Sequence, residues 1–376
     1  SWHIENTSDR MVNHLGNWKN GELGDFVTLK RGFDLPQQKR EDGQVPIFSS
    51  SGITGTHSTA MVKAPGVITG RYGTIGEVFY AAKDFWPLNT TLFVEDFHGN
   101  DAKFIYYFLK TLEWSKFTSA SAVPGINRNT VHKEIVSLPD IETQRRIAST
   151  LSMFDEKIKI NTEINDNLLD QAQTLYKQHF PYSVQDDLPD GWRIGTVGEI
   201  IEIHDSKRIP LSGADRMKME KKIYPYYGAA SLMDYVDNYI FDGKYLLLGE
   251  DGTVVDDAGY PILQYVWGQF WVNNHAHILT GRLGFNVESL YMLFKQTPVK
   301  SIVTGAVQPK ISQANLRSVQ VVIPPERNLK EYNDLVEPLF SLLRANEEEC
   351  KSLAALRDTL LPKLMSGEID VSAVQL

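Results

Sequence analysis

Apolar residues recur in alternating steps of three and four in two long segments of the chain, residues 142–180 and 326–365. The pattern continues for about five heptads in each segment, which is typical of a coiled-coil helix. The recurring positions are Ile147, Leu151, Phe154, Ile158, Leu168, Ala172 and Leu175, and then Val336, Leu339, Leu343, Cys350, Leu353 and Leu360. Each segment is therefore predicted to form one long helix whose apolar stripe must be buried against a partner.

An asparagine interrupts each stripe. Asn161 and Asn346 stand 185 residues apart, at equivalent points of the two segments. A buried polar residue in a coiled-coil seam lowers stability but fixes the register and orientation of the partner helix. We therefore expect both asparagines to lie in the seam, with positions at its edge as the alternative.

The regions between these segments have a different pattern. Short β-type runs such as VITGRYGTIGEVFYAA (67–82) and KYLLLGEDGTVV (244–255) alternate with turns rich in Gly, Pro and Ser. One helical stretch, AKFIYYFLKTLEWSKF (102–117), lies among them. This mixture predicts mixed α/β domains.

The whole pattern occurs twice. Residues 17–26 match 191–200 at an offset of 174, residues 45–52 match 224–231 at 179, and residues 85–90 match 270–275 at 185. Offsets that grow by small steps indicate loop insertions within a tandem duplication. The predicted fold class is therefore α+β, with two mixed α/β domains in a pseudo-two-fold duplication, joined by two long helices that pair as an antiparallel coiled coil. The predicted divisions are 1–140, helix 141–180, linker 181–194, 195–323, and helix with tail 324–376.

The net charge of −9 argues at first against a nucleic-acid partner. Residues 21–140 and 195–323 each hold 12 basic and 13 acidic residues, whereas 324–376 holds 6 basic and 10 acidic residues. The α/β regions are thus nearly neutral, and either can carry a basic face. The single cysteine excludes an internal disulfide, and no apolar run approaches the ~20 residues that span a bilayer. We expect a cytoplasmic protein without membrane partners.

The two regions share a turn of the form G-x-x-G-T, but its charge is reversed. VITGRYGTIG (67–76) carries Arg71 between its glycines, and LLLGEDGTVV (246–255) carries Glu250 and Asp251. The turns lack the lysine and helix that follow a phosphate-binding loop. We expect their glycines to supply a positive φ in a tight turn.

The sequence offers no motif for catalysis. It contains no G-x-x-x-x-G-K-S/T loop, no H-E-x-x-H helix and no G-x-S-x-G elbow. His275 and His277 alternate along a predicted strand, but no cysteine or carboxylate cluster stands near them, so they are interpreted as loop or core histidines and no metal site is expected. These observations favour a binding and positioning protein without a cofactor.

Several segments resemble a known family. LPDIETQRRIASTLSMFDEKI (138–158) and LRDTLLPKLMSGEIDV (356–371) resemble the helical regions of type I restriction-modification specificity subunits, and LPDGW (188–192) and TGAVQPKIS (304–312) fit the same family. The resemblance extends from about Trp18 to Val371. The second helix departs from the pattern at its start, where ERNLKEYNDL (326–335) replaces a glutamine-led opening.

The resemblance implies a non-catalytic subunit with two target recognition domains, each of which recognises one half of a split, asymmetric site in double-stranded DNA. Two modification subunits, which are adenine methyltransferases, would bind the spacer helices and the domains, and restriction subunits would join that core. The methyl donor and ATP would belong to those partners, and the complex would be a DNA methyltransferase and restriction endonuclease.

Lys and Arg are suited to phosphate contacts, and Arg, Lys, Asn and Gln to base edges. The DNA-binding candidates in the first domain are Lys30, Arg31, Lys39, Arg40, Arg71, Tyr72, Asn127, Arg128 and Asn129. Those in the second domain are Lys207, Arg208, Arg216, Lys218, Lys221, Lys222, Gln308 and Lys310. We expect Arg71 to contact a base, and Lys207 and Arg208 to contact phosphate.

Three other functions are compatible with the sequence. One is the specificity subunit of a related system whose methylation and cleavage activities reside on a single partner chain. Another is an adaptor that joins two proteins through a coiled coil and does not bind DNA. A catalytic enzyme is the least favoured, because the sequence contains none of these active-site motifs.

Overall fold

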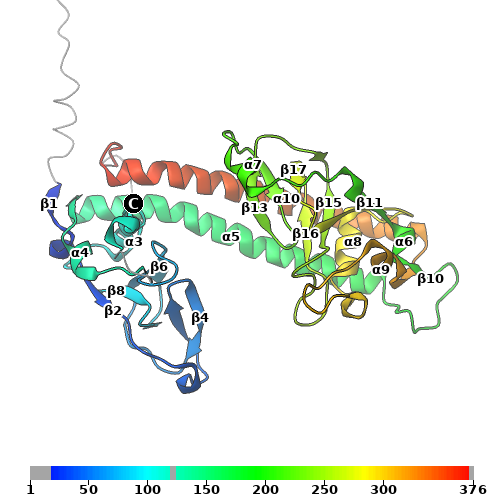
Figure 1. Cartoon of the computed structure of the whole chain (residues 1–376), viewed down its shortest axis with the longest axis horizontal. Coiled ribbons are helices and arrows are strands. Elements are labelled where there is room, and N and C mark those ends of the chain that lie inside the picture. The colour runs from blue at the N-terminus through cyan, green and yellow to red at the C-terminus, as the bar shows by residue number, and fades with distance from the viewer. Residues whose placement is uncertain (1–17, 119–123, 372–376) are drawn as a thin grey trace, which may run out of the picture. The chain divides into compact units, whose positions relative to one another are not determined.

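The structure is a computed structural model that describes residues 18–118 and 124–371. The described residues divide into two compact units, unit 1 with residues 18–118, 124–160 and 349–371, and unit 2 with residues 161–348. Each unit contains one α/β region and a length of each of the two long helices, α5 (Ile141–His179) and α10 (Glu326–Met365) (Figure 1). No helix among the described residues is both long and apolar enough to span a membrane.

Unit 1 is built on a four-stranded antiparallel sheet. Its strands lie in the order β2 (Thr28–Arg31), β8 (Thr91–Asp96), β5 (Gly66–Gly70) and β6 (Val78–Ala81). A smaller sheet has the order β4 (Gly52–His57), β3 (Val45–Ser49) and β7 (Trp86–Pro87). A third, two-stranded sheet pairs β1 (Lys19–Glu22) with β9 (Ile135–Leu138), which lies directly before α5.

Unit 2 repeats this topology. Its main sheet has the order β11 (Ile201–Ile203), β18 (Ala276–Gly281), β15 (Tyr245–Gly249) and β16 (Leu263–Val266). The smaller sheet has the order β13 (Leu232–Val236), β12 (Tyr224–Tyr227), β17 (Gln269–Val272) and β14 (Phe241–Asp242). The pair β10 (Arg193–Thr196) and β19 (Gln320–Ile323) lies directly before α10. The predicted duplication is confirmed.

Short helices also correspond between the units. Unit 1 contains α2 (Leu23–Phe26), α3 (Ala102–Lys110) and α4 (Arg128–His132), and unit 2 contains α6 (Val197–Ile200), α7 (Gly213–Met217), α8 (Val287–Phe294) and α9 (Gln313–Ser318). Short 3-10 turns span Gln37–Lys39, Trp114–Phe117, Asp205–Lys207 and Lys300–Ile302. Both α2 and α6 begin with a reciprocal capping box, formed by Glu22 with Asp25 and by Thr196 with Glu199.

The helical stretch predicted over 102–117 is divided in two. The helix α3 ends at Lys110, and residues 114–117 form a separate 3-10 turn. Thr111 Oγ1 donates to the Phe108 carbonyl at 2.7 Å, and Trp114 Nε1 donates to the Leu109 carbonyl at 2.9 Å. Side chains thus satisfy the last carbonyls of α3, which the apolar periodicity of the sequence does not reveal.

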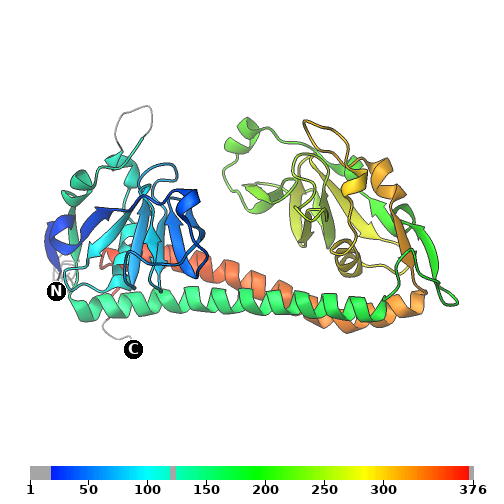
Figure 2. The same cartoon turned by 90° about the horizontal axis from the view of Figure 1, so that it is seen from below.

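The two long helices run antiparallel in both units. In unit 1, Arg357 lies 2.5 Å from Asp155, and Cys350 Sγ lies 3.7 Å from the Ile158 carbonyl. In unit 2, the Tyr332 hydroxyl donates to the Ala172 carbonyl at 3.0 Å. Residue numbers fall along α10 as they rise along α5, so the predicted pairing is confirmed (Figure 2).

Both predicted seam asparagines are buried, with Asn161 0% exposed and Asn346 8% exposed. Asn346 Nδ2 donates to Asn165 Oδ1 at 2.8 Å, and Asn165 Nδ2 donates to the Leu343 carbonyl at 3.2 Å. Asn165 is therefore a polar seam residue that the sequence pattern does not single out. Because each amide group must find a partner, these bonds fix which turns of the two helices meet.

The helices are also part of the two main cores. In unit 1, Ile147 and Leu151 of α5 and Leu364 of α10 pack with the sheet and with α3. In unit 2, Tyr176 and Phe340 belong to the core that contains strands β15 and β18. Burying the helix stripes and folding the α/β regions are therefore one event in each unit.

A substitution in α5 tests this coupling. Leu151 is 0% exposed, whereas Met153, two residues later on the same helix, is 57% exposed. Leu151→Asp buries a charge without a partner and should lower the free energy of unfolding by about 4 kcal/mol. Met153→Asp should change it by no more than about 0.5 kcal/mol. Thermal melting followed by circular dichroism measures both, and equal melting curves would contradict the coupled core.

Candidate nucleic-acid interface

The duplicated turn follows β5 in unit 1 and β15 in unit 2. Its second glycine has a positive φ in both units, 77° at Gly73 and 84° at Gly252, as the sequence predicts. The first glycine serves a different purpose. A Cβ on Gly70 would lie 1.8 Å from the Thr74 carbonyl oxygen, and one on Gly249 would lie 3.1 Å from that of Thr253. The turn therefore closes tightly on itself in both units.

Backbone hydrogen bonds hold the residue after the first glycine in the same way in both units. Arg71 N donates to the Thr90 carbonyl at 2.8 Å, and the Arg71 carbonyl accepts from Ile126 N at 3.0 Å. The corresponding bonds of Glu250 join it to His275 and to Ile311, each at 2.8 Å. Arg71 and Glu250 therefore occupy the same place in the two units, and their opposite charges are presented at the same point.

Six predicted DNA-binding residues line one pocket of about 480 Å³ in unit 1. We call it the arginine pocket, and its residues are Arg31, Arg71, Tyr72, Asn127, Arg128 and Asn129. Arg31 ends β2 opposite Leu92 of β8, and Arg71 follows the end of β5, the next strand of the sheet. Asn127 and Arg128 begin α4. The strand order thus brings together three segments that are far apart in the sequence.

The arginine pocket offers hydrogen-bond donors. The Arg71 guanidinium lies 4.5 Å from the centre of the Tyr72 ring, a cation–π contact. Arg31 lies 3.7 Å from Asp34, and both side chains are exposed. Among the residues described, neither Arg71 nor Arg128 has a carboxylate within 4.0 Å. Asn127 Oδ1 accepts from Asn129 N at 3.0 Å, which leaves its amide NH₂ group as a donor. The pocket is therefore suited to a group rich in acceptors.

Unit 2 places a cluster of ions at the corresponding positions. The last paired residues of β11 and β18 are Ile203 and Leu279. Continuing the same register by two residues places Asp205 opposite His277. The equivalent pair in unit 1 is Arg31 and Leu92. Asp205 stands 174 residues after Arg31, and Arg208 stands 174 residues after Asp34. Arg31 and Arg71 are thus replaced by Asp205 and Glu250, while Asp34 is replaced by Arg208. We call Asp205, Arg208, Glu250, His277 and Lys310 the ion cluster.

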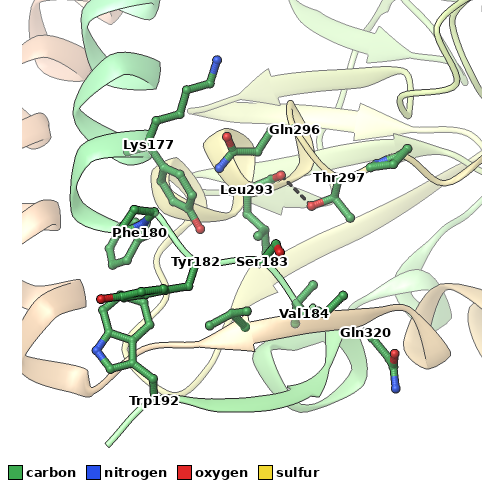
Figure 3. Close-up of a pocket in the computed structure, with 15 residues that line it drawn as sticks. Lys177, Phe180, Tyr182, Ser183, Val184, Trp192, Leu293, Gln296, Thr297 and Gln320 are labelled. Carbon is green, nitrogen blue, oxygen red and sulfur yellow. Dashed lines mark hydrogen bonds between the residues drawn. The ribbon is translucent and has the colours of Figure 1, made fainter. Parts of the chain in front are cut away.

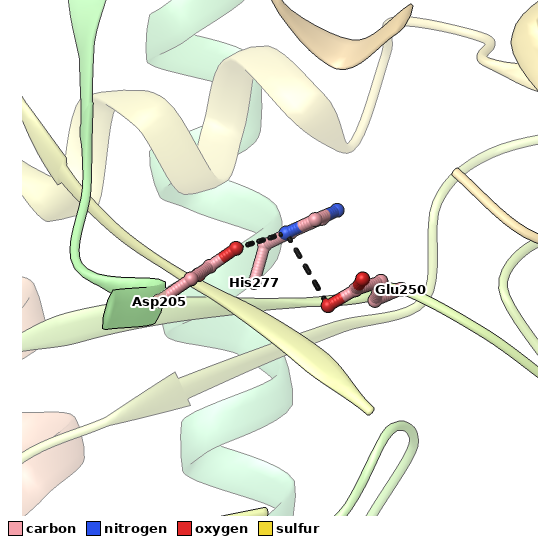
Figure 4. Close-up of side chains that lie close together, drawn as sticks. All are labelled: Asp205, Glu250 and His277. Atoms are coloured by element: carbon pink, nitrogen blue, oxygen red, sulfur yellow. Dashed lines mark hydrogen bonds and ion pairs between the residues drawn. The ribbon is translucent and has the colours of Figure 1, made fainter. Parts of the chain in front are cut away.

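His277 lies at the centre of the ion cluster and is 0% exposed (Figure 4). Its Nε2 lies 2.7 Å from the Ile311 carbonyl oxygen, which can only accept a hydrogen bond. Its Nδ1 lies 2.6 Å from Asp205 Oδ2, and that carboxylate also accepts from Ile278 N and Gln313 Nε2. Both ring nitrogens therefore face hydrogen-bond acceptors.

Cations of the chain neutralise the two buried carboxylates. Arg208 donates to Glu250 Oε2 at 2.6 Å and to the Ala276 carbonyl at 2.8 Å, and Lys310 lies 3.2 Å from Glu250 Oε1. Burial acts to raise the pKa of Asp205, but the hydrogen bond and charge of His277 outweigh it and hold that pKa below its usual value. Burial acts in the same way on Glu250, and the bond from Arg208 likewise keeps the pKa of this carboxyl low.

Asp205, Glu250 and His277 also have the composition of a metal site, with ligand atoms within 4.8 Å of one another. A metal needs a lone pair on the imidazole, and both nitrogens of His277 face acceptors. The carboxylates already bind Arg208 and Lys310. The cluster is thus arranged as an ion network in which Arg208 binds the carboxylate that a metal ion would otherwise bind.

The interpretation of the two histidines needs one correction. His277 is a core histidine, as expected, but the expectation that no carboxylates surround the pair is wrong. Asp205 and Glu250 reach His277 from distant segments, and Asp251 Oδ1 lies 2.5 Å from His275 Nδ1. Only His277 lies in β18, and His275 precedes that strand. The sequence contains one signal for the first member of the ion cluster: the 174-residue offset between the repeats places Asp205 at the position of Arg31.

The remaining candidates lie outside these two sites. In unit 1, Lys30 is 2.5 Å from Glu95, Lys39 is exposed, and Arg40 donates to the Thr54 carbonyl at 3.3 Å. In unit 2, Arg216 and Lys222 both pair with Asp234, at 3.4 and 3.3 Å. The other candidates of unit 2, Lys207, Lys218, Lys221 and Gln308, are exposed, as are Lys222 and Lys310.

Another pocket in unit 2, of about 380 Å³, lies where α5 ends (Figure 3). Phe180, Tyr182 and Trp192 line it, and the rings of Tyr182 and Trp192 are 5.0 Å apart. Lys177 is its one charged lining residue, and none of the candidate DNA-binding residues lines it. It is the place where the segment after α5 packs against the unit.

Fold and site together define a duplicated, two-domain binding protein whose equivalent positions carry different polar groups. The type I restriction modification DNA specificity domain matches residues 16–170 and again residues 189–354, so the chain belongs to this family. It has a DNA sequence-specificity role and is a non-catalytic part of a type I restriction-modification system.

Individual relatives match most of the chain. A putative type I specificity subunit of Mycoplasma pneumoniae is 27% identical and aligns over 94% of this chain and 97% of its own length. The MjaIX specificity subunit of Methanocaldococcus jannaschii is 23% identical over 73% of this chain and 70% of its own. The crystal structure of a type I restriction-modification S subunit from M. genitalium has the same fold, with a TM-score of 0.59, 20% identity, and coverage of 93% and 96%.

Neighbouring residues of the ion cluster allow a matched test. The Arg208 side chain is 14% exposed and bonded to Glu250, whereas Lys207 is exposed. Arg208→Ala removes a counter-charge from Glu250 and from the buried Asp205 and should destabilise unit 2 by about 3 kcal/mol. Lys207→Ala should change stability by less than about 0.5 kcal/mol. Urea denaturation measures both variants, and an Arg208→Ala protein as stable as the Lys207→Ala protein would show that the network is not structural.

Proposed function

We propose that this chain is the subunit that determines which DNA sequence a type I restriction-modification enzyme acts on. Each α/β region would recognise one half of a bipartite, asymmetric site in double-stranded DNA. The observation that carries this proposal is the charge reversal on a duplicated scaffold. Arg71 and Glu250 are held by equivalent backbone bonds yet present opposite charges.

This difference is what recognition of an asymmetric site requires. Two identical domains related by a two-fold would recognise two identical half-sites. Here the scaffold is retained, because the strand orders of the main sheets agree, while the polar side chains at equivalent positions differ. The two regions should therefore prefer different bases.

The proposal extends to partners. Two modification subunits, adenine methyltransferases, would bind the paired helices and the α/β regions, and restriction subunits would join them. The methyl donor and ATP would be bound by those subunits. The helices α5 and α10 would set the distance between half-sites, because an α-helix rises ~1.5 Å per residue and is stiff when paired.

The arginine pocket favours DNA binding over the adaptor function. A surface with three arginines and no acidic lining residue is suited to phosphates or base edges. Exposed lysines such as Lys207, Lys218 and Lys221 would add contacts to the backbone. A related system with a single methylation-and-cleavage partner would use this chain in the same way.

Exchanging one α/β region tests whether each region recognises its half-site independently. Residues 195–323 would be replaced by the corresponding region of another specificity subunit, and the chimera assembled with the modification subunits. We expect the methylated motif to change in one half only, since the other region is untouched. Sequencing of methylated DNA reads both halves at once. Simultaneous change of both halves would contradict independent recognition.

A further inference from the structure

The arginine pocket and the ion cluster occupy the same position in the two repeats, but only the pocket leaves its charges available. In the ion cluster, Glu250 binds Arg208 and Lys310, and Asp205 binds His277. Their side chains are 13% and 3% exposed. In the arginine pocket, the side chains of Arg31 and Arg128 are exposed, and Arg71 is held by a ring, not by a carboxylate.

We propose that the arginine pocket is the place where the first α/β region contacts an acceptor-rich group of its half-site, and that Arg71 makes this contact. In the second region the ions of the chain fill the same position, so Arg208 is a positioning residue and does not contact DNA. This inference rests on the proposed function, because it assigns a DNA group to a site within it.

The donors of the pocket define the group that it can bind. The guanidinium groups of Arg31, Arg71 and Arg128 contain hydrogen-bond donors and no acceptor atoms. The side-chain oxygen of Asn127 already accepts a bond from Asn129 N. DNA offers two groups with paired acceptors, the O6 and N7 edge of guanine and the phosphate oxygens. Both match the planar fork of a guanidinium, and a variant of Arg71 can tell them apart.

The stacking of Arg71 on Tyr72 prepares this contact. With the guanidinium 4.5 Å from the ring centre, the side chain loses less freedom when it binds. The backbone on both sides is already fixed by Thr90 and Ile126. Arg71 therefore presents its donors from a rigid base, as selective recognition requires.

In unit 2 the arginine of the ion cluster uses its donors within the chain. Arg208 gives one nitrogen to Glu250 and to the Ala276 carbonyl, and a second lies 3.5 Å from Asp205. For Arg208 to bind DNA it would have to give up its bond to Glu250 and its proximity to the buried Asp205, which is costly. The base contacts of unit 2 should therefore come from other side chains.

The test uses the chain assembled with its modification subunits. Arg71→Ala, Arg71→Lys and a control, Lys63→Ala, are compared with the unaltered complex. Lys63 lies in the same unit, is 90% exposed and does not line the pocket. Binding is measured on duplexes that carry the methylated motif and on duplexes that lack it, over a range of salt concentrations. The methylated motif and the melting temperature are recorded for each variant.

A guanine contact predicts that Arg71→Ala weakens binding about 5- to 150-fold on the cognate duplex only and relaxes one G·C position of one half-site. Arg71→Lys would not restore it, because lysine lacks the bidentate fork. A phosphate contact predicts an equal loss on all duplexes and a salt slope smaller by about one, both largely restored by lysine. Either result supports the proposal and identifies the group.

Unchanged affinity and motif in a folded Arg71→Ala complex would overturn the proposal. So would an equal loss of affinity in Arg71→Ala and Lys63→Ala, because Lys63 does not line the pocket. If the proposed function itself is wrong, the unaltered complex will neither bind nor methylate a bipartite site. That outcome differs from one in which only the Arg71 variants behave as the unaltered complex does.

Discussion

Burial of the apolar stripes of α5 and α10 is the constraint on which both units depend. Each helix is too polar on its other faces to be stable alone, and in each unit the two stripes meet in antiparallel contact. The same residues enter the core of the α/β regions, as Leu151 does in unit 1 and Phe340 in unit 2. The polar seam residues Asn165 and Asn346 then select one register, because any other would leave a buried amide unpaired.

On this scaffold the chain can vary charge without changing shape. The glycines of the duplicated turn and the bonds around Arg71 and Glu250 involve the backbone, so they tolerate any side chain between the glycines. The first repeat places Arg71 there without a carboxylate partner among the described residues, and the second places Glu250 there as part of a network with Arg208 and His277. A duplicated fold can in this way contact two unlike surfaces with one set of strands.

The sequence predicts the long helices closely, because a heptad repeat reports which face is buried; residues 142–180 and 326–365 correspond to Ile141–His179 and Glu326–Met365. It also predicts the duplication, and it singles out the basic and amide residues of the arginine pocket by their side-chain chemistry. That these residues line one pocket depends on the strand order, which the sequence does not reveal. It does not reveal that Asp205, Glu250 and His277 meet, because their contact depends on strand order and register over more than 70 residues. Nor does it show that Arg208 is enclosed, because burial of a charged side chain follows from partners elsewhere in the chain.

Under the proposed function, one chain with two unlike α/β regions determines a bipartite DNA sequence. Sequencing of methylated bases in the genome of a host with and without this chain measures this determination. We expect one asymmetric motif, made of two different half-sites separated by a fixed non-specific gap, to carry methyladenine only when the chain is present. Loss of no motif, or loss of a continuous palindromic one, would contradict it.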